Sequence, residues 1–450
     1  MTQTHFILLS LTIWAAGLLG QSTSPNVQDQ FSALISADES VRQDALDHLE
    51  ANWEPGHAPL LVELMRLLND PWFEDNVIPL LEGQTGQRYG HDYYAWLQWL
   101  WSHDPVYPYY YADFKAELYS YIDPKFETYF FRRGGLADIR LDEVVWGGVV
   151  QDGIPPLRYP RMTAASEAAY LADTDVVFGA EINGDARAYP KRILAWHEMF
   201  VDQIGGRPIA GVYCTLCGTV IAYDMEHQGT IHNLGTSGFL YRSNKLMYDA
   251  ATQSLWSTIE GRPVIGPLTG KGIVLDVHPV VTTTWGAWRQ RHPHTKVLSL
   301  DTGHSRDYSE GAAYREYFST DQLMFPVPRQ DTRLNNKDEV LIVRAEGYRA
   351  DPLAISIDYL RKQTVHQDRI GDVHLVVIAD KDGAARAYHR DETSFRSFRN
   401  GVLKDTAGEV WEVHESHLVG PDGQRLIRLP AHNSFWFAWY NAYPETRLVK

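Results

Sequence analysis

Two segments of this chain resemble each other in sequence. A valine pair followed by a turn and the residues Ala-Arg-Ala-Tyr occurs within residues 176–189 and again within residues 376–388. A Trp-x-Ala-Trp sequence occurs at residues 285–288 and again at residues 436–439, and in both places a proline and a threonine follow at identical spacing. Because tryptophan and proline are rare residue types, the match indicates a duplicated unit, with copies at about residues 172–299 and 370–450.

The sequence of this duplicated region is typical of β-structure. From residue 138 onward, short runs of β-branched residues alternate with Gly, Pro, Asn and Asp, which predicts strands separated by turns. The clearest predicted strands lie at residues 176–178, 208–213, 219–223 and 375–378. Asn183-Gly184 favours a hairpin with a type I′ turn. We therefore expect a β-rich domain over residues 138–450.

Residues 28–133 instead show helical periodicity. Ser40, with Gln43 three residues later, predicts a capping box before a helix. The apolar positions that recur at helical spacing include Val41, Ala45, Leu46, Leu49, Leu60, Leu61, Leu64, Leu67 and Leu68. Helix pairs at this spacing resemble HEAT-like repeats, which stack because one pair cannot bury its apolar face alone. The predicted fold class is α+β, with a helical repeat-like domain before the β-rich domain; an ordinary helical cap is the alternative.

The amino terminus carries an apolar run at residues 6–20. Its length suits the core of a signal peptide and falls short of the roughly 20 residues that span a bilayer. We expect residues 1–22 to be an export signal, either cleaved or retained as an anchor. This places the protein outside the cytoplasm, in the periplasm or secreted, where disulfides can persist.

The charge balance restricts the partners. The chain has 450 residues, with 41 Lys and Arg against 57 Asp and Glu, and a formal net charge of -16. Such a surface repels phosphate backbones and anionic lipids, so we expect no nucleic-acid partner. Residues 265–272 lack the spacing of a phosphate-binding loop, and no nucleotide cofactor is expected. The partner remains an unidentified small molecule or protein.

The chain contains two cysteines, Cys214 and Cys217, in the sequence Cys-Thr-Leu-Cys-Gly between two predicted strands. A thioredoxin-type motif needs a helix after its first cysteine, and no helix is predicted there. A turn between strands is instead typical of a metal-binding knuckle, in which Gly218 adopts a positive φ.

Two thiolates leave a tetrahedral metal short of ligands. His197 is the nearest plausible third ligand, with His232 or Met247 as weaker candidates. A soft site of this kind suits copper, zinc or iron, so we expect a metal-binding or metal-dependent redox function. The polar residues that could orient a bound group are Glu198, Ser237, Arg242, Asp249 and Arg187, although Arg187 recurs as Arg386 and is more simply explained as a structural ion pair.

Two other functions fit the same cysteines. The protein could be a binding or scaffold module with a structural Cys214–Cys217 disulfide. It could also be a thiol oxidoreductase, which predicts that one sulfur is exposed and has a lowered pKa.

Several motifs together resemble a known family. They lie at residues 152–155 (DGIP), 184–190 (GDARAYP), 196–198 (WHE), 213–218 (YCTLCG), 235–238 (GTSG), 246–249 (LMYD), 254–256 (SLW) and 435–439 (FWFAW). This set is similar to the bacterial and archaeal domain-of-unknown-function family numbered 3179, from about residue 150 to the end. The chain has Thr215 where that family usually has Cys-Pro-x-Cys, and a family of this kind implies no activity.

Overall fold

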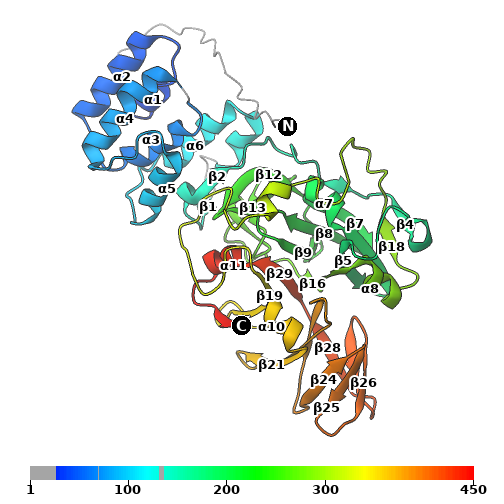
Figure 1. Cartoon of the computed structure of the whole chain (residues 1–450). Helices are drawn as coiled ribbons and strands as arrows, with labels where there is room; N and C mark the ends of the chain where they lie inside the picture. The colour runs from blue at the N-terminus through cyan, green and yellow to red at the C-terminus, as the bar shows by residue number, and fades with distance from the viewer. Residues whose placement is uncertain (1–26, 69, 131–135) are drawn as a thin grey trace. The chain divides into compact units, whose positions relative to one another are not determined.

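The computed structural model describes residues 27–68, 70–130 and 136–450 (Figure 1). The chain divides into two compact units, residues 1–132 and 133–450. The first is helical and the second is rich in strands, which confirms the α+β prediction. The predicted export signal at residues 1–22 lies outside the described residues. Within the described ranges, no helix combines the length and the apolar character needed to cross a membrane.

The first unit is built from short helices. They are α1 (Val27–Ala33), α2 (Glu39–Ala51), α3 (His57–Met65), α4 (Pro71–Thr85), α5 (Tyr93–Trp101) and α6 (Tyr111–Ser120), followed by a 3-10 helix (Pro124–Thr128). Ala45, Leu46 and Leu49 of α2 are buried, as the periodicity predicts. The predicted cap at Ser40 is wrong, because the helix begins at Glu39, two residues earlier than a cap at Ser40 would give. Asp38 is the cap, and its carboxylate accepts the backbone N–H of Ser40 at 2.9 Å.

The second unit begins with a sheet of strand order β17-β5-β6-β18-β4. Its strands are β4 (Met162–Ala164), β5 (Val176–Ile182), β6 (Asp185–Pro190), β17 (Val281–Thr284) and β18 (Lys296–Leu298). Asn183 and Gly184 connect β5 to β6 with φ values of 49° and 80°. Two successive positive φ values are those of a type I′ turn, and the predicted hairpin is confirmed.

A central sheet has the order β16-β9-β8-β7-β3. Its strands are β3 (Leu157–Arg158), β7 (Met199–Ile204), β8 (Arg207–Cys214), β9 (Thr219–Asp224) and β16 (Val277–His278). Alternate residues of β8 face two different cores: Ile209 and Tyr213 enter one, while Ala210 and Val212 enter the other. The sheet is therefore covered on both faces, and a turn that leaves it remains close to the protein interior.

A third sheet packs against the second of these cores, with the order β1-β15-β14-β13-β12-β2. Its strands are β1 (Leu136–Ala137), β2 (Val144–Trp146), β12 (Leu234–Tyr241), β13 (Asn244–Asp249), β14 (Leu255–Ser257) and β15 (Arg262–Gly266). A small hairpin of β10 (Glu226–His227) and β11 (Thr230–Ile231) precedes it.

A second copy of the first sheet follows, with the order β29-β19-β20-β30. Its strands are β19 (Glu339–Val343), β20 (Leu353–Ser356), β29 (Ala431–Phe435) and β30 (Arg447–Val449). The strand directions equal those of β17-β5-β6-β18, including one parallel pair at the end. The Trp-x-Ala-Trp sequences form equivalent helices, α8 (Trp285–Arg291) and α11 (Trp436–Ala442).

The other sequence match lies on strands that occupy different positions. Residues 176–189 form β5 and β6, whereas residues 376–388 lie on β22 (Val373–Ala379) and β23 (Ala385–His389). These belong to an eight-stranded sheet of order β21-β22-β23-β28-β27-β26-β25-β24. The structural repeat thus includes β19 and β20, which precede residue 370.

The remaining elements complete the unit. The strands are β21 (Val365–Ile370), β24 (Phe395–Arg399), β25 (Val402–Asp405), β26 (Val410–Val413), β27 (His417–Val419) and β28 (Arg425–Leu429). The helices are α7 (Lys191–His197), α9 (Arg315–Phe318) and α10 (Ile357–Lys362), with 3-10 turns at Leu141–Glu143 and Ala165–Glu167.

Candidate functional site

The two cysteines lie at the tight turn between β8 and β9. Cys214 pairs with Thr219 across the turn, and the backbone N–H of Cys217 donates to the carbonyl of Cys214 at 3.1 Å. Both thiols are free, and their sulfurs lie 2.7 Å apart. Cys214 is 2% exposed and Cys217 is 0% exposed. The turn therefore brings two thiols together in the interior, within reach of a bond between them.

Gly218 makes this turn possible for two reasons. Its φ of 58° lies in the left-handed region that side chains rarely adopt. A Cβ atom at this position would also lie 2.7 Å from the ring of Phe435. The prediction of a positive φ at Gly218 is confirmed, and so is the absence of a helix after Cys217, because β9 begins at Thr219.

The hairpin turn between β12 and β13 holds both sulfurs. Arg242 and Ser243 form this turn, with φ values of 51° and 63°. The carbonyl of Ser243 accepts a hydrogen bond from the Cys217 thiol at 3.2 Å. The backbone N–H of Lys245 donates to the sulfur of Cys214. One turn of the third sheet thus offers an acceptor to one thiol and a donor to the other.

These contacts shift the pKa values of the two thiols in opposite directions. Burial is the largest influence and by itself raises the pKa of Cys214, and the Glu198 carboxylate raises it further. The hydrogen bond with Cys217, the positive charge of Lys245 and the Lys245 backbone N–H outweigh both effects, so the pKa of Cys214 is lowered. Burial and the neighbouring Cys214 raise the pKa of Cys217 well above its usual value. Cys214 is therefore the first of the pair to become a thiolate, while Cys217 keeps its proton.

A buried ion pair lies beside the thiols. The ammonium nitrogen of Lys245 is 3.3 Å from a carboxylate oxygen of Glu198 and also donates to the Glu198 carbonyl at 2.9 Å. The other carboxylate oxygen accepts the hydroxyl of Thr215, which lies in the cysteine turn, and the hydroxyl of Tyr314 at 3.4 Å. Glu198 itself is held in a left-handed conformation at the end of α7, and its carbonyl accepts the backbone N–H of Tyr213. The Glu198 carboxylate is thus held beside the cysteine turn by Lys245, Thr215 and Tyr314, which lie in different parts of the chain.

The second copy of the duplicated sheet covers the thiols. The backbone N–H of Phe435 donates to the carbonyl of Cys217 at 2.7 Å, and the hydroxyls of Thr219 and Ser434 lie 2.9 Å apart. The hydroxyl of Tyr317 donates to the carbonyl of Leu216 at 2.7 Å. Residues distant in the sequence therefore close the turn from solvent.

His197, the predicted third ligand, lies between Pro155 and Tyr308. Its Nδ1 lies 2.9 Å from the carbonyl of Pro155, and its Nε2 lies 2.6 Å from the hydroxyl of Tyr308. Since a carbonyl can only accept, Nδ1 carries the proton and Nε2 accepts from Tyr308. Burial lowers the pKa of His197 to about 4, so the ring is neutral at neutral pH. Both ring nitrogens are thus engaged by neighbouring groups.

The other predicted site residues have partners of their own. Ser237 donates a hydrogen bond to the Leu246 carbonyl at 2.7 Å, and Asp249 accepts one from Thr252 at 2.8 Å. Met247 lies in the core beside Trp256, and the ring of His232 also contacts Trp256. Arg242 forms an ion pair with Glu143. Arg187 pairs with Asp185 and Asp202, and its counterpart Arg386 pairs with Glu415. Of the predicted set, only Glu198 adjoins the cysteine turn through direct hydrogen bonds.

No group of three or more His, Cys, Asp or Glu residues is arranged to hold one metal ion within the described part of the chain. The sequence reasoning missed Lys245, Thr215 and Tyr314. Lys245 carries a usable signal, since it is a charged residue directly before the apolar residues Leu246 and Met247 in a short strand.

The fold and the site define a protein with a helical unit, a β-rich unit of several sheets and a buried Cys-x-x-Cys turn. The chain belongs to the family described as Protein of unknown function (DUF3179), whose model matches residues 151–446. The match covers the thiol turn, the ion pair and the covering residues, and it leaves out the helical unit. No curated protein and no solved structure matches the chain.

Proposed function

We propose that Cys214 and Cys217 form a redox couple that cycles between a dithiol and a disulfide. The observation that supports this proposal best is the buried ion pair of Lys245 and Glu198 beside two free thiols. A buried ion pair rarely improves stability over well-packed apolar residues, because both charges must be desolvated. A purely structural disulfide would not need it, whereas a thiolate at Cys214 gains from the Lys245 ammonium and backbone N–H, which both lower the Cys214 pKa against the opposing charge of Glu198.

The burial of both sulfurs restricts the oxidant. The expectation that one sulfur of an oxidoreductase is exposed is not met, since Cys214 is 2% and Cys217 0% exposed. A folded protein disulfide is therefore a poor partner, and we infer a small oxidant, either a peroxide or a low-molecular-weight disulfide.

The chemistry balances with either oxidant. The Cys214 thiolate attacks a peroxide oxygen to give a sulfenic acid and an alcohol or water. The Cys217 thiol then attacks that sulfur, which forms the disulfide and releases water. With a small disulfide, the Cys214 thiolate forms a mixed disulfide and releases one thiol, and attack by Cys217 releases the second. In both cases the two cysteines lose two electrons and the oxidant gains them.

A redox titration of the folded protein tests the proposal. The protein is equilibrated in buffers with a graded ratio of a small thiol to its disulfide and is then quenched with acid. Its free thiols are counted after the quenched protein has been unfolded in denaturant. We expect a single two-electron transition in the wild type and none in Cys214→Ser or Cys217→Ser. Lys245→Met is expected to shift the midpoint, whereas the exposed Lys271→Met is not. A pair that stays oxidised at every ratio would support a structural disulfide instead.

A soft metal ion remains the second candidate. The convergence of two sulfurs favours it, and Cys214 and Cys217 would then act as thiolate ligands for copper, zinc or iron, with any further ligand supplied from outside the described set. Metal analysis of protein purified without a histidine tag, wild type beside Cys214→Ser, tests it. Stoichiometric metal that disappears in the variant would favour this candidate over the redox couple.

We further propose that the protein is exported from the cytoplasm, because residues 1–22 have the pattern of an export signal.

For the helical unit we propose a HEAT-like arrangement, which is supported by the succession of short helices α1 to α6.

A further inference from the structure

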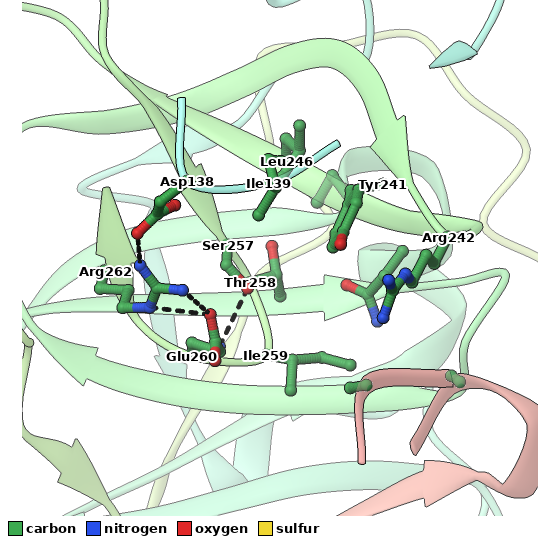
Figure 2. A pocket seen from close by; sticks show the side chains of 14 residues that line it. Asp138, Ile139, Tyr241, Arg242, Leu246, Ser257, Thr258, Ile259, Glu260 and Arg262 are labelled. Atoms are coloured by element: carbon green, nitrogen blue, oxygen red, sulfur yellow. Dashed lines mark hydrogen bonds and ion pairs between the residues drawn. The ribbon is translucent and has the colours of Figure 1, made fainter. Parts of the chain in front are cut away.

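A cavity of about 180 Å³ lies in the second unit, between the third sheet and α11. Figure 2 shows its wall, with Ile139, Tyr241 and Leu246 on one side and Thr258 and Ile259 facing the same space. An apolar cavity of about 150 Å³ is enough to hold benzene. The cavity therefore has room for one small organic molecule.

Two buried side chains of the wall have polar atoms without a hydrogen-bond partner in the described part of the chain. Asn244 is 7% exposed, and neither its Oδ1 nor its Nδ2 has a hydrogen-bond partner among the described residues. Thr258 is 1% exposed, and its hydroxyl is likewise unpartnered within the described ranges. Both residues line the cavity. Buried polar groups in folded proteins are nearly always hydrogen-bonded, so three such atoms at one cavity point to a ligand that completes them.

The charges of the wall are balanced. Each charged side chain there has an opposite partner: Arg262 pairs with Asp138 and Glu260, Arg242 with Glu143, and Lys245 with Glu198. Figure 2 shows the Arg262 cluster at one side of the cavity. The apolar part of the wall is formed by Ile139, Leu246, Ile259, Ala438 and Ala442. A charged ligand would find no free countercharge, and its desolvation would disfavour binding.

We propose that this cavity binds a small uncharged molecule that carries a primary carboxamide on a compact apolar or aromatic body. A carboxamide presents a donor and an acceptor side by side, and so does Asn244. The two amides can pair edge to edge, with the ligand N–H donating to Oδ1 and Nδ2 donating to the ligand carbonyl. The Thr258 hydroxyl takes a remaining hydrogen bond. An alcohol could satisfy only part of this set. The proposal goes beyond the redox couple and does not depend on it.

Benzamide is the probe, and toluene, benzyl alcohol and benzoate are comparison compounds of similar shape. Binding to the full chain is measured by calorimetry and by ligand-observed nuclear magnetic resonance. We expect saturable binding of benzamide that is at least tenfold tighter than binding of toluene or benzoate. Tighter binding of benzoate would overturn the proposal, and so would equal binding of toluene and benzamide, or no saturation by benzamide.

Variants of similar shape test whether benzamide binds in this cavity. Thr258→Val is expected to weaken benzamide about tenfold, as the loss of one hydrogen bond does. Asn244→Leu is expected to abolish the preference for benzamide over toluene. Thr269→Val is the matched control, because the Thr269 hydroxyl is also buried and unpartnered among the described residues but does not line the cavity. Equal weakening in Thr269→Val and Thr258→Val would place binding elsewhere and overturn the proposal. Melting curves of each variant show that it is folded.

Discussion

The ammonium of Lys245 lies 3.3 Å from the carboxylate of Glu198, in the space that also holds the sulfur of Cys214. The pair has two effects that can be measured separately. Each of the two buried charges needs the other, because either one alone would be desolvated without a counterion. Their charges also shift the pKa of the Cys214 thiol in opposite directions, Glu198 upward and Lys245 downward.

Lys245→Met is expected to raise the pKa of Cys214, because the variant loses the positive charge that favours the thiolate. It is also expected to lower the free energy of unfolding by about 3 kcal/mol, since Glu198 is left buried without its partner. The ultraviolet absorbance of the thiolate against pH gives the first quantity, and urea unfolding gives the second. The double variant with Glu198→Gln should recover much of the stability. Lys271→Met, on the surface, should change neither.

Stability is expected to fall as the pH falls from about 6.5 to about 4, because of His197. Burial lowers the pKa of His197 in the folded state from 6.5 to about 4. Between these values the unfolded chain binds the proton and the folded chain does not, so acid favours unfolding, by at most about 3 kcal/mol for this residue. Above about pH 6.5 both states are neutral and the effect disappears. Urea unfolding at a series of pH values should show a shallower acid loss in His197→Gln, while the exposed His389→Gln should follow the wild type.

Gly218→Ala is expected to destabilise the protein by more than a positive φ alone requires. The new Cβ would be strained and would also meet the ring of Phe435 at 2.7 Å. Gly184→Ala is the control, because Gly184 has a φ of 80° and open space around its Cβ direction. We expect a loss of about 1 kcal/mol for Gly184→Ala and about 3 kcal/mol for Gly218→Ala, measured by denaturant unfolding. Equal losses would show that Phe435 does not constrain the turn.

Occupation of the cavity is expected to slow alkylation of the thiols. Asn244 lies between Ser243 and Lys245, which hydrogen-bond to Cys217 and Cys214. A ligand held by Asn244 should restrict this turn and so the opening that exposes the sulfurs. Iodoacetamide labelling with and without benzamide measures the effect, and Thr258→Val should reduce it. An unchanged labelling rate at saturating benzamide would show that the cavity and the thiols are independent.

Much of the local structure follows from the sequence. The Asn183-Gly184 hairpin, the strands on both sides of the cysteines and the positive φ of Gly218 depend on residues close in the chain, and each is confirmed. The matched tryptophans are also informative: the indoles of Trp288 and Trp439 both donate to a threonine seven residues later, Thr295 and Thr446, at 2.9 Å. A repeated spacing of rare residues thus reflects a repeated packing arrangement.

The site itself depends on contacts that local patterns do not contain. Lys245 and Glu198 are far apart in the sequence, and only the packing of the third sheet against the central sheet brings them together. His197 was a plausible ligand by proximity in the chain, yet its ring is held by Pro155 and Tyr308. The match between residues 176–189 and 376–388 reflects similar hairpins in different positions, since a turn with flanking strands recurs wherever two strands must be joined.

Phe435 and Ser434 make the two copies unequal partners. The first copy carries the thiols, while the second supplies the backbone and side chains that close over them. The sheet without cysteines thus shields the thiols of the sheet that has them. A substitution at Phe435 or Ser434, far from either sulfur in the sequence, is therefore expected to change how readily the thiols react.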